Sequence, residues 1–316
     1  CYTSGTTGNP KGVLYSHRST LLHAFSVLTI PGMNLGEESA VLPVVPMFHV
    51  NAWGVPYFAP MVGAKIVFPG PKRDGESLAE LINNEGVTEA WGVPTVWLGL
   101  LGHMRKTEQK FTSLKRVLIG GSAAPRAMMR EFQEKYGVEG LQGWGMTEMS
   151  PIGTVSMIRP KDADLPLDRQ FDIKAKQGRA VFGVEMKIVN DDGQALPRDG
   201  KSFGELLVRG PAIISGYYEN PEASAKAFDS EGWFRTGDVS KIDPEGYMEI
   251  VDRTKDVIKS GGEWISSIDL ENEAVGHPEI AEAAVIAVHH PKWDERPLLV
   301  VVREPDSQLG KQGVID

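Results

Sequence analysis

The stretch "KRVLIGGSAAPRAMMREFQEKYG", residues 115–137, carries the pattern that decides the fold class. Its first apolar run ends at two glycines, as expected of a buried strand that is followed by a tight loop. Pro125 suits the first turn of a helix, apolar side chains recur at four-residue spacing from Met128 to Tyr136, and Gly137 can cap the end. A strand, a loop and a helix in this order favour an α/β layered fold with a mostly parallel sheet, whose ligand sites lie at the carboxyl ends of its strands.

Two neighbouring regions extend this prediction. The run "AKIVF" at 64–68 is closed by proline and predicts another buried strand. From about Gly204 the sequence pattern changes to short runs of alternating apolar and polar residues, separated by turns such as "DPEG". This pattern predicts antiparallel strands over about 204–250, arranged as a small β-barrel.

The last part of the chain predicts a smaller unit of helix and strands. The charged stretch Arg253–Asp256 is a candidate linker. Ser266 and Asp269 form a capping-box pattern that predicts a helix running to about Val275. Strands are expected at "AAVIAV" (283–288) and "PLLVVV" (297–302), so the domains are predicted at 1–252 and 253–316.

Composition excludes several classes of protein. The 316 residues are 41% hydrophobic and 24% charged, and no apolar run approaches the roughly 20 residues that span a bilayer. A net charge of -9 argues against a nucleic-acid binder. The single cysteine, Cys1, excludes an internal disulfide and a cysteine-based zinc site, which fits a reducing, cytoplasmic location. A start at Cys and an end at "KQGVID" favour an internal piece of a longer protein.

The opening loop "YTSGTTGNPKGV", Tyr2–Val13, has three readings on its residues alone: a mobile tail, a phosphate-binding loop, or a segment from the interior of a domain. Small residues with free N–H groups and hydroxyls can surround phosphate oxygens, and Lys11 adds a positive charge. The Walker pattern G-x-x-x-x-G-K-[ST] is not met, because Pro10 precedes Lys11 and Gly12 follows it. The loop by itself leaves the three readings open.

Six further motifs follow the opening loop in a fixed order. They are "PMFHVNAWG" (46–54), "GGSAAP" (120–125), "GWGMTE" (143–148), "GELLVRGPAIISGYY" (204–218), "GWFRTGD" (232–238) and "VDRTKDVIKSGGEWIS" (251–266). Together they resemble the signatures of the adenylate-forming superfamily, which includes acyl-CoA synthetases, nonribosomal peptide adenylation domains and firefly-type luciferases. The resemblance covers nearly the whole chain.

The resemblance implies a fold and a reaction. The fold would be a large N-terminal domain of layered α/β sheets with a small β-barrel subdomain, followed by the start of a small α+β C-terminal domain. The reaction would couple a carboxylic acid to ATP, giving acyl-AMP and pyrophosphate, and a thiol such as that of CoA would then displace AMP. Mg²⁺ would accompany ATP, and a homodimer is kept as one alternative assembly.

The resemblance also assigns nucleotide-binding residues. The β- and γ-phosphates would be bound by Thr3, Ser4, Gly5, Thr6, Thr7, Gly8 and Lys11. Thr147 would contact the α-phosphate, and Glu148 would hold Mg²⁺, a cation that prefers carboxylate and phosphate oxygens. The adenine would be bounded by Gly121, Ala123, Ala124, Gly143, Trp144, Gly145 and Met146. Asp238 would accept the ribose hydroxyls, and Arg253 would reach the ribose or a phosphate.

The acid and CoA sites are implied in the same way. His49 would be a catalytic residue at the junction of the carboxylate and the acyl pocket. It would line that pocket with Trp53 and Val55, although a histidine and apolar residues of this kind are also common in protein cores. Lys255 would be the hinge of the C-terminal domain, or else a solvated linker lysine. The pantetheine arm of CoA would pass Lys259, Ser260, Gly261, Gly262, Glu263 and Trp264.

Three alternatives accompany this reading. "GGSAA" is a near match to a nucleophile elbow, but Ala124 stands where glycine is needed, so a hydrolase with Ser122 as nucleophile is disfavoured. The acyl group could instead pass to a carrier protein, or the chain could bind nucleotide without catalysis.

The stretches "FHVNAWG" and "HHPKWDERPLLVVV" are most similar to the medium- to long-chain fatty acyl-CoA synthetase branch. His289, His290 and Asp294 are assigned no metal. The family's C-terminal lysine would lie beyond Asp316, so the isolated chain is expected not to adenylate acids.

Overall fold

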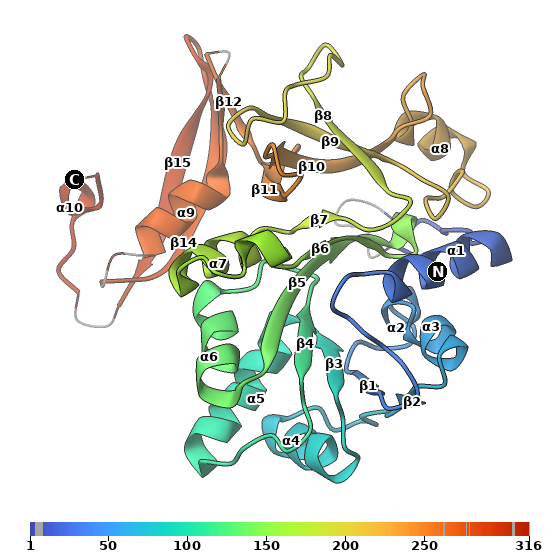
Figure 1. Ribbon diagram of the computed structural model, residues 1–316. Helices are drawn as coiled ribbons and strands as arrows, with labels where there is room; N and C mark the ends of the chain where they lie inside the picture. The colour runs from blue at the N-terminus through green and yellow to red at the C-terminus, as the bar shows by residue number, and fades with distance from the viewer. Residues whose placement is uncertain (4–8, 262, 276, 278, 305–306, 316) are drawn as a thin grey trace. The chain divides into compact units, whose positions relative to one another are not determined.

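The computed structural model describes residues 1–3, 9–261, 263–275, 277, 279–304 and 307–315 (Figure 1). It divides into two compact units. The first contains Cys1–Met186, Leu207–Arg235 and Asp243–Glu249, and the second contains Lys187–Leu206, Thr236–Ile242 and Ile250–Asp316.

A seven-stranded sheet organises the first unit. Its strands are β1 (Ala40–Pro43), β2 (Lys65–Ile66), β3 (Glu89–Gly92), β4 (Arg116–Ile119), β5 (Glu139–Gly145), β6 (Ile152–Ser156) and β7 (Arg179–Ala180). They lie in the order β2-β1-β3-β4-β5-β6-β7. The first five in this order are parallel, whereas β6 is antiparallel to both β5 and β7. The mostly parallel sheet predicted from the sequence is confirmed, with a reversal of strand direction after β5.

Helices cover both faces of this sheet (Figure 1). One face carries α4 (Gly75–Asn84), α5 (Pro94–Thr107), α6 (Arg126–Tyr136) and α7 (Leu167–Lys174). The other face carries α1 (His17–Leu28), α2 (Val50–Trp53) and α3 (Val55–Met61). Side chains of β4 alternate between the two cores, since Val117 and Ile119 pack with the first set of helices and Leu118 with the second.

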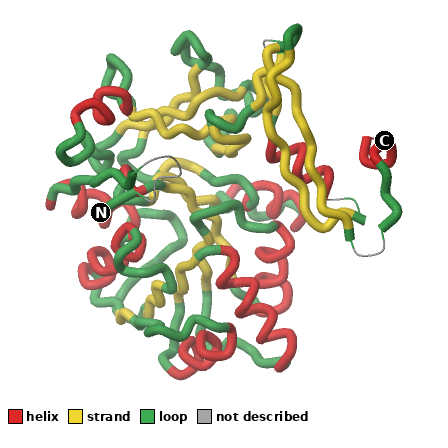
Figure 2. Tube along the Cα trace, turned by 180° about the vertical axis from the view of Figure 1, so that it is seen from behind, coloured by secondary structure: helices red, strands yellow, loops and turns green. Residues whose placement is uncertain are grey.

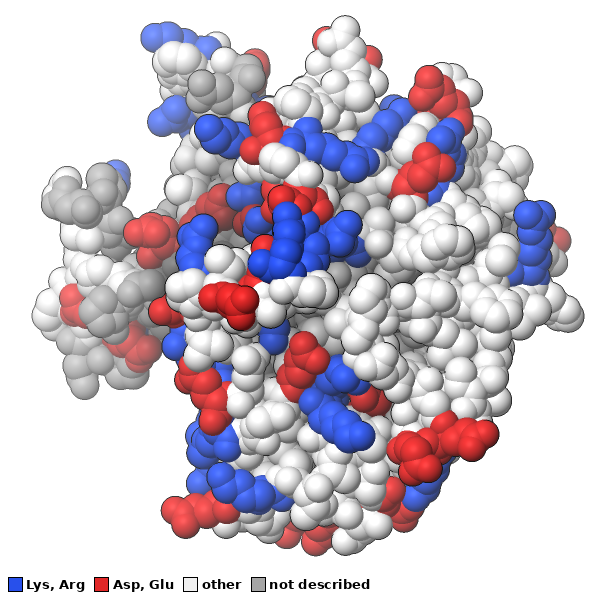
Figure 3. All heavy atoms as spheres, in the orientation of Figure 1, with Lys and Arg blue, Asp and Glu red and all other residues white. Residues whose placement is uncertain are grey.

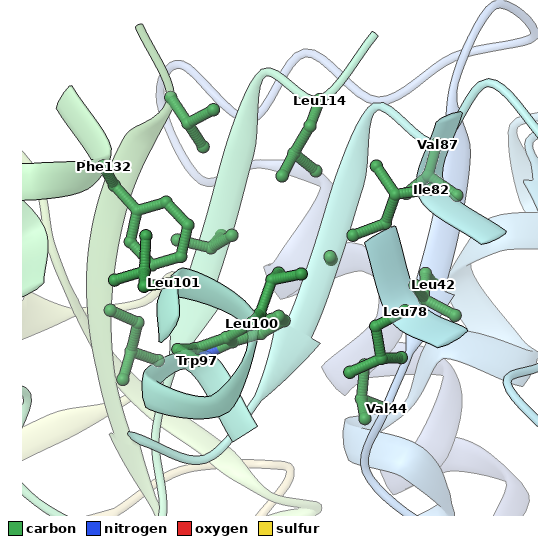
Figure 4. Close-up of a cluster of buried hydrophobic side chains, with 14 of the residues drawn as sticks. Leu42, Val44, Leu78, Ile82, Val87, Trp97, Leu100, Leu101, Leu114 and Phe132 are labelled. Carbon is green, nitrogen blue, oxygen red and sulfur yellow. The ribbon is translucent and has the colours of Figure 1, made fainter. Parts of the chain in front are cut away.

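The larger core lies under α4, α5 and α6 (Figure 4). Trp97 and Leu100 of α5 are fully buried there, and Trp97 meets Phe132 of α6 edge-on, with ring centroids 6.3 Å apart. The prediction for α6 is confirmed: Pro125 precedes the helix, and Gly137 ends it in the left-handed conformation at φ 66°. A buried aromatic or leucine side chain of this kind contributes about 1.5–3 kcal/mol.

A charged ladder crosses the amino ends of three parallel strands. Glu89 of β3 lies beside Arg116 of β4, which lies beside Glu139 of β5. Arg116 binds both carboxylates, through Nη1 to Glu89 Oε1 at 2.7 Å and through Nε to Glu139 Oε2 at 3.0 Å. Burial raises the pKa of Glu89 to about 7, and the Arg116 charge only partly opposes that rise.

A second sheet has the strand order β11-β10-β9-β8. Its members are β8 (Glu185–Val189), β9 (Phe203–Arg209), β10 (Phe234–Ile242) and β11 (Met248–Arg253). The strand-rich region predicted from about Gly204 therefore includes one strand that precedes it, β8. Three short helical segments, η1 (Thr147–Met149), η2 (Pro160–Asp162) and α8 (Pro221–Ala227), belong to the first unit.

The remainder of the second unit is a third sheet with the order β13-β12-β15-β14. Its elements are β12 (Ile258–Ser260), β13 (Glu263–Ile265), α9 (Ser267–Val275), β14 (Ile280–His290), β15 (Asp294–Arg303) and α10 (Lys311–Ile315). The predicted helix cap is confirmed, because the Asp269 N–H donates to Ser266 Oγ at 3.0 Å. The two predicted strands are also confirmed, as an antiparallel hairpin of β14 and β15 (the long yellow strands of Figure 2).

Candidate active site

The strand reversal between β5 and β6 builds the centre of the candidate site. Thr147 and Glu148 lie in η1, in the connection that follows the carboxyl end of β5. The Met146 N–H donates to the Pro151 carbonyl at 3.1 Å, which closes the connection across its ends. Both Thr147 and Glu148 are buried, so their side chains are fixed by what surrounds them.

Three residues distant in sequence hold this pair. The Tyr15 hydroxyl donates to the Thr147 carbonyl at 2.5 Å. The Ile214 N–H donates to the Glu148 carbonyl at 3.0 Å, and the Tyr217 hydroxyl donates to Glu148 Oε1 at 2.8 Å. Burial and the Glu148 charge raise the pKa of both tyrosines, so each hydroxyl stays protonated and remains a donor.

The opening loop begins and ends as a paired ribbon. Tyr2 and Gly12 form an antiparallel bridge, and the Thr3 N–H donates to the Lys11 carbonyl at 2.9 Å. The Lys11 N–H donates in turn to Thr3 Oγ1 at 3.1 Å. The candidate phosphate-binding residues Ser4, Gly5, Thr6, Thr7 and Gly8 lie outside the described residues. Lys11 therefore stands at the end of a loop whose base is closed by hydrogen bonds.

Lys11 lies close to the tyrosine that holds Glu148. Its Nζ is 4.3 Å from the centroid of the Tyr217 ring, within the range of a cation–π contact. The Tyr218 N–H donates to the Gly12 carbonyl at 2.9 Å, which joins the two segments through the backbone. A cation and a carboxylate are thus brought into one region of the first unit, next to Thr147 in the chain.

The "GGSAA" loop after β4 is attached to β5. The Ala124 N–H donates to Oε1 of Gln142, a buried side chain on β5, at 3.1 Å. Gly121 adopts φ 82°, a conformation that side chains rarely allow, and Ala123 is exposed. This arrangement leaves backbone rather than bulky side chains along the loop, as its candidate role beside a purine requires.

Glycines of the "GWGMTE" segment are required by close contacts. A Cβ on Gly145 would lie 2.1 Å from the Pro151 carbonyl oxygen, and one on Gly143 would lie 3.3 Å from a methyl group of Leu118. Trp144 is buried with its ring over Gly153, whose added Cβ would lie 2.8 Å from it. The ring proposed to stack on adenine is therefore packed against β6 in this structure.

The three candidate acyl-pocket residues lie in different surroundings. Trp53 packs on the "GGSAA" loop, since a Cβ on Gly120 would lie 2.9 Å from its ring. Val55 is fully buried in the core beneath α3, and His49 is exposed at the start of α2. Trp53 is the member of the three that the structure places against another candidate segment.

A buried histidine that the sequence did not indicate joins α1 to this region. The Ile152 N–H, at the start of β6, donates to His23 Nε2 at 2.9 Å. An added Cβ on Gly54 would lie 3.2 Å from the His23 ring. Burial lowers the pKa of His23 to about 4, so the ring accepts this hydrogen bond in its neutral form.

The second unit holds the candidate ribose residues and hinge. Arg253 Nη1 lies 2.7 Å from Oδ1 of the buried Asp238, so β10 and β11 bring these two residues together. The Thr254 N–H donates to the Gly237 carbonyl at 2.9 Å. Lys255 is exposed, with its Nζ 3.8 Å from Asp256.

The candidate CoA residues occupy β12, β13 and their connection. Lys259 Nζ binds Asp191 Oδ1 at 2.6 Å and lies 4.5 Å from the centroid of the Trp264 ring. Ser260 is buried, and the Gly261 N–H donates to the Trp293 carbonyl at 2.9 Å. Gly262 and the side chain of Glu263 lie outside the described part of the chain.

The chemistry of the first-unit cluster suits a nucleotide phosphate with a divalent cation. Carboxylate and hydroxyl oxygens are the ligands that Mg²⁺ prefers, and it normally takes its remaining ligands from phosphates and water. Within the described ranges, no group of three His, Cys, Asp or Glu side chains gathers as a metal site. On the face shown in Figure 3, positive and negative side chains are interspersed.

Comparison with known proteins decides the family. The model of the AMP-binding enzyme family matches residues 1–218, and the model of the AMP-binding enzyme C-terminal domain matches residues 269–315. The chain belongs to the AMP-binding enzyme family. The resemblance seen in the sequence motifs is confirmed.

Relatives of this AMP-binding enzyme include two acid–CoA ligases. It is 55% identical over 309 residues to a medium-chain-fatty-acid–CoA ligase of Ectopseudomonas oleovorans, covering 98% of this chain and 56% of that protein. It is 55% identical over 303 residues to a 3-methylmercaptopropionyl-CoA ligase of Ruegeria lacuscaerulensis, covering 96% of this chain and 56% of that protein. The chain thus spans about half the length of the curated relatives it matches.

Solved structures agree with the fold. The O-succinylbenzoate CoA synthetase of Bacillus subtilis, solved with ATP and a magnesium ion, has a TM-score of 0.82 and 28% identity. The alignment covers 98% of this chain and 61% of that one. In the described part of the AMP-binding enzyme, no helix is both long and apolar enough to cross a membrane.

Proposed function

We propose that the chain carries much of the active site of an ATP-dependent carboxylate–CoA ligase. The observation that supports this most directly is the cluster at the end of β5, where one tyrosine contacts both Glu148 and Lys11. A buried carboxylate beside a lysine and a paired loop suits a polyphosphate with its divalent cation. The identity to two acid–CoA ligases supports the choice of reaction.

In the first half-reaction, an oxygen of the substrate carboxylate attacks the α-phosphorus of ATP and pyrophosphate leaves. Lys11 and the loop after Thr3 are proposed to bind the β- and γ-phosphates, and Thr147 the α-phosphate. Glu148 is proposed to hold Mg²⁺, which would offset phosphate charge when bound. Asp238 and Arg253 are proposed to bind the ribose.

In the second half-reaction, the CoA thiolate attacks the acyl carbonyl and AMP leaves. Lys259, Ser260, Gly261 and Trp264 are proposed to line the path of the pantetheine arm, and Lys255 to act as the hinge. The hinge would join the N-terminal part, residues 1–252, to the first part of a C-terminal domain at 253–316. An exposed Lys255 between β11 and β12 is compatible with that role.

The proposed acid is a medium- to long-chain fatty acid or a short thioether acid. This choice rests on the relatives, which include a medium-chain-fatty-acid–CoA ligase and a 3-methylmercaptopropionyl-CoA ligase. Trp53 and His49 are proposed to bound the acyl site, and Val55 is buried in the same core as Trp53.

The test is the release of AMP by the protein expressed together with any sequence that flanks this chain in its gene. AMP should appear only when ATP, Mg²⁺, CoA and an accepted acid are all present, and acids of increasing chain length should define the substrate. A phosphopantetheinyl carrier replacing CoA as acceptor would favour the carrier alternative. Absence of AMP with every acid, despite measurable ATP binding, would favour nucleotide binding without catalysis.

A further inference from the structure

Tyr217 lies at a junction of three segments. It follows β9 and forms an antiparallel bridge with Val13, at the end of the opening loop. Its N–H donates to Ser224 Oγ at 2.8 Å, which attaches it to α8. The side chain is only 8% exposed, so neither backbone nor ring can move freely.

The hydroxyl and the ring of Tyr217 contact two different charged residues. The hydroxyl donates to Glu148 Oε1 at 2.8 Å, and the ring face lies 4.3 Å below Lys11 Nζ. The carboxylate and the ammonium therefore do not need to pair with each other, because each has a separate partner on the same phenol. Such an arrangement leaves both charges available to a third group.

The Tyr217 hydroxyl is the part of the side chain that contacts the Glu148 carboxylate. A hydrogen bond from a neutral donor to one carboxylate oxygen orients the carboxylate without removing its charge. Outer partners of this kind orient metal ligands in many metal sites.

We propose that Tyr217 is a positioning residue that sets Glu148 and Lys11 at the separation and orientation needed by a Mg²⁺–triphosphate. The proposal rests on the function proposed above. The hydroxyl orients the metal-binding carboxylate, and the ring holds the phosphate-binding lysine. The two effects are separable, because phenylalanine keeps the ring and removes the hydroxyl.

Tyr217→Phe is therefore the main variant, with Tyr218→Phe as its matched control. Tyr218 is the next residue and is 57% exposed, so the same atom is removed without touching Glu148. Tyr217→Leu removes both the hydroxyl and the ring. If Tyr217→Leu does not fold, as judged by far-UV circular dichroism and the urea midpoint, Tyr217→Met is used in its place as the non-aromatic variant.

The first measurement is binding, made on the chain itself. Mn²⁺ affinity at saturating ATP is followed by electron paramagnetic resonance, and ATP affinity without metal is followed by calorimetry in EDTA. For Tyr217→Phe, the Mn²⁺ Kd should rise about three- to tenfold, as expected for one lost hydrogen bond, while the metal-free ATP Kd changes less than about twofold. For Tyr217→Leu, the metal-free ATP Kd should also rise, by about threefold.

The second measurement is kinetic, made with the protein and its flanking sequence. Tyr217→Phe should raise the Mg²⁺ concentration for half-maximal rate and leave kcat at saturating Mg²⁺ within about threefold of wild type. A merely structural role would lower kcat and the urea midpoint together without moving the Mg²⁺ profile.

The outcomes separate this inference from the proposed function. If wild type binds no ATP and releases no AMP, the proposed function fails. If wild type binds Mn²⁺–ATP and Tyr217→Phe has the same Mn²⁺ affinity as Tyr218→Phe, the positioning role is wrong. If both non-aromatic variants unfold, the comparison of the two phenylalanine variants still decides the part played by the hydroxyl.

Discussion

Replacing Glu89 with glutamine should make the stability of the first unit depend on pH in a new way. Glu89 is 3% exposed at the amino end of β3, and Arg116 occupies one of its oxygens. Its other oxygen, Oε2, is buried and has no hydrogen-bond partner among the described residues. Ionising this carboxyl in the folded protein therefore leaves part of its charge uncompensated.

The magnitude follows from the pKa of Glu89, which burial raises from an ordinary 4.5 to about 7. Between these values the folded state holds a proton that the unfolded state has released, so wild-type stability falls with rising pH by about 1.4 kcal/mol per pH unit. The contribution is complete below pH 4.5 and lost above about pH 7, about 3 kcal/mol in all. Glutamine cannot ionise, so Glu89→Gln removes this slope.

The titration of His23 changes the free energy of unfolding with the opposite sign over nearly the same pH range. Burial lowers its pKa from 6.5 to about 4, so its contribution is complete above pH 6.5 and lost as the pH falls toward 4. In wild type the two slopes nearly cancel between pH 4.5 and 6.5. In Glu89→Gln the His23 slope stands alone, and the variant should lose stability on acidification where wild type stays nearly level.

The assay is urea unfolding followed by tryptophan fluorescence at pH 4.5, 5.5, 6.5 and 7.5. The quantity compared is the variant minus wild-type free energy of unfolding, which cancels groups common to both. It should rise by about 1 kcal/mol per pH unit from pH 4.5 to 6.5 and by less from pH 6.5 to 7.5, where Glu89 also ionises in the folded protein. Glu85→Gln, which removes a half-exposed partner of Lys65, serves as the control for charge removal. A difference that stays constant across the series would refute the reasoning about Glu89.

Three further substitutions test packing and the turn at the site. Leu100→Ala should cost about 2–5 kcal/mol of unfolding free energy, because the Leu100 side chain of α5 is fully buried in the larger core; the urea midpoint measures this. Gly145→Ala should lower both the urea midpoint and the ATP affinity, because its Cβ would meet the Pro151 carbonyl at 2.1 Å. Gly99→Ala should instead raise the midpoint, by up to about 1 kcal/mol in free energy, because Gly99 lies inside α5 with nothing within 4 Å of an added Cβ. A stabilised Gly145→Ala or a destabilised Gly99→Ala would contradict these two assignments.

Local patterns carried most of the fold prediction. The strand, loop and helix at 115–137 were predictable because glycine, proline and apolar spacing act within a few residues of one another. The reversal at β6 was not predicted, since strand direction depends on pairing rather than on local composition. One signal was present: the six residues between β5 and β6 are fewer than the dozen or more that a parallel crossover needs.

Some residues of the candidate site could be predicted from a local motif, whereas their contact partners could not. Thr147 and Glu148 could be proposed from the sequence because their motif is contiguous. Their partners Tyr15 and Tyr217 lie 132 and 69 residues away, and His23 lies 129 residues from Ile152. No local spacing relates residues so far apart, so these contacts needed the folded chain. The roles assigned to the motif residues themselves stay predictions.

The short connection between β5 and β6 sets a rule for building variant libraries from this scaffold. Its six positions are closed at both ends by the hydrogen bond from Met146 to Pro151 and carry the Thr147–Glu148 pair inside. An insertion or deletion there that shifted β6 by a residue would exchange its side chains between two faces that are both buried. Diversity is therefore better introduced by substitution at exposed positions around the connection, with its length held constant in every member of the library.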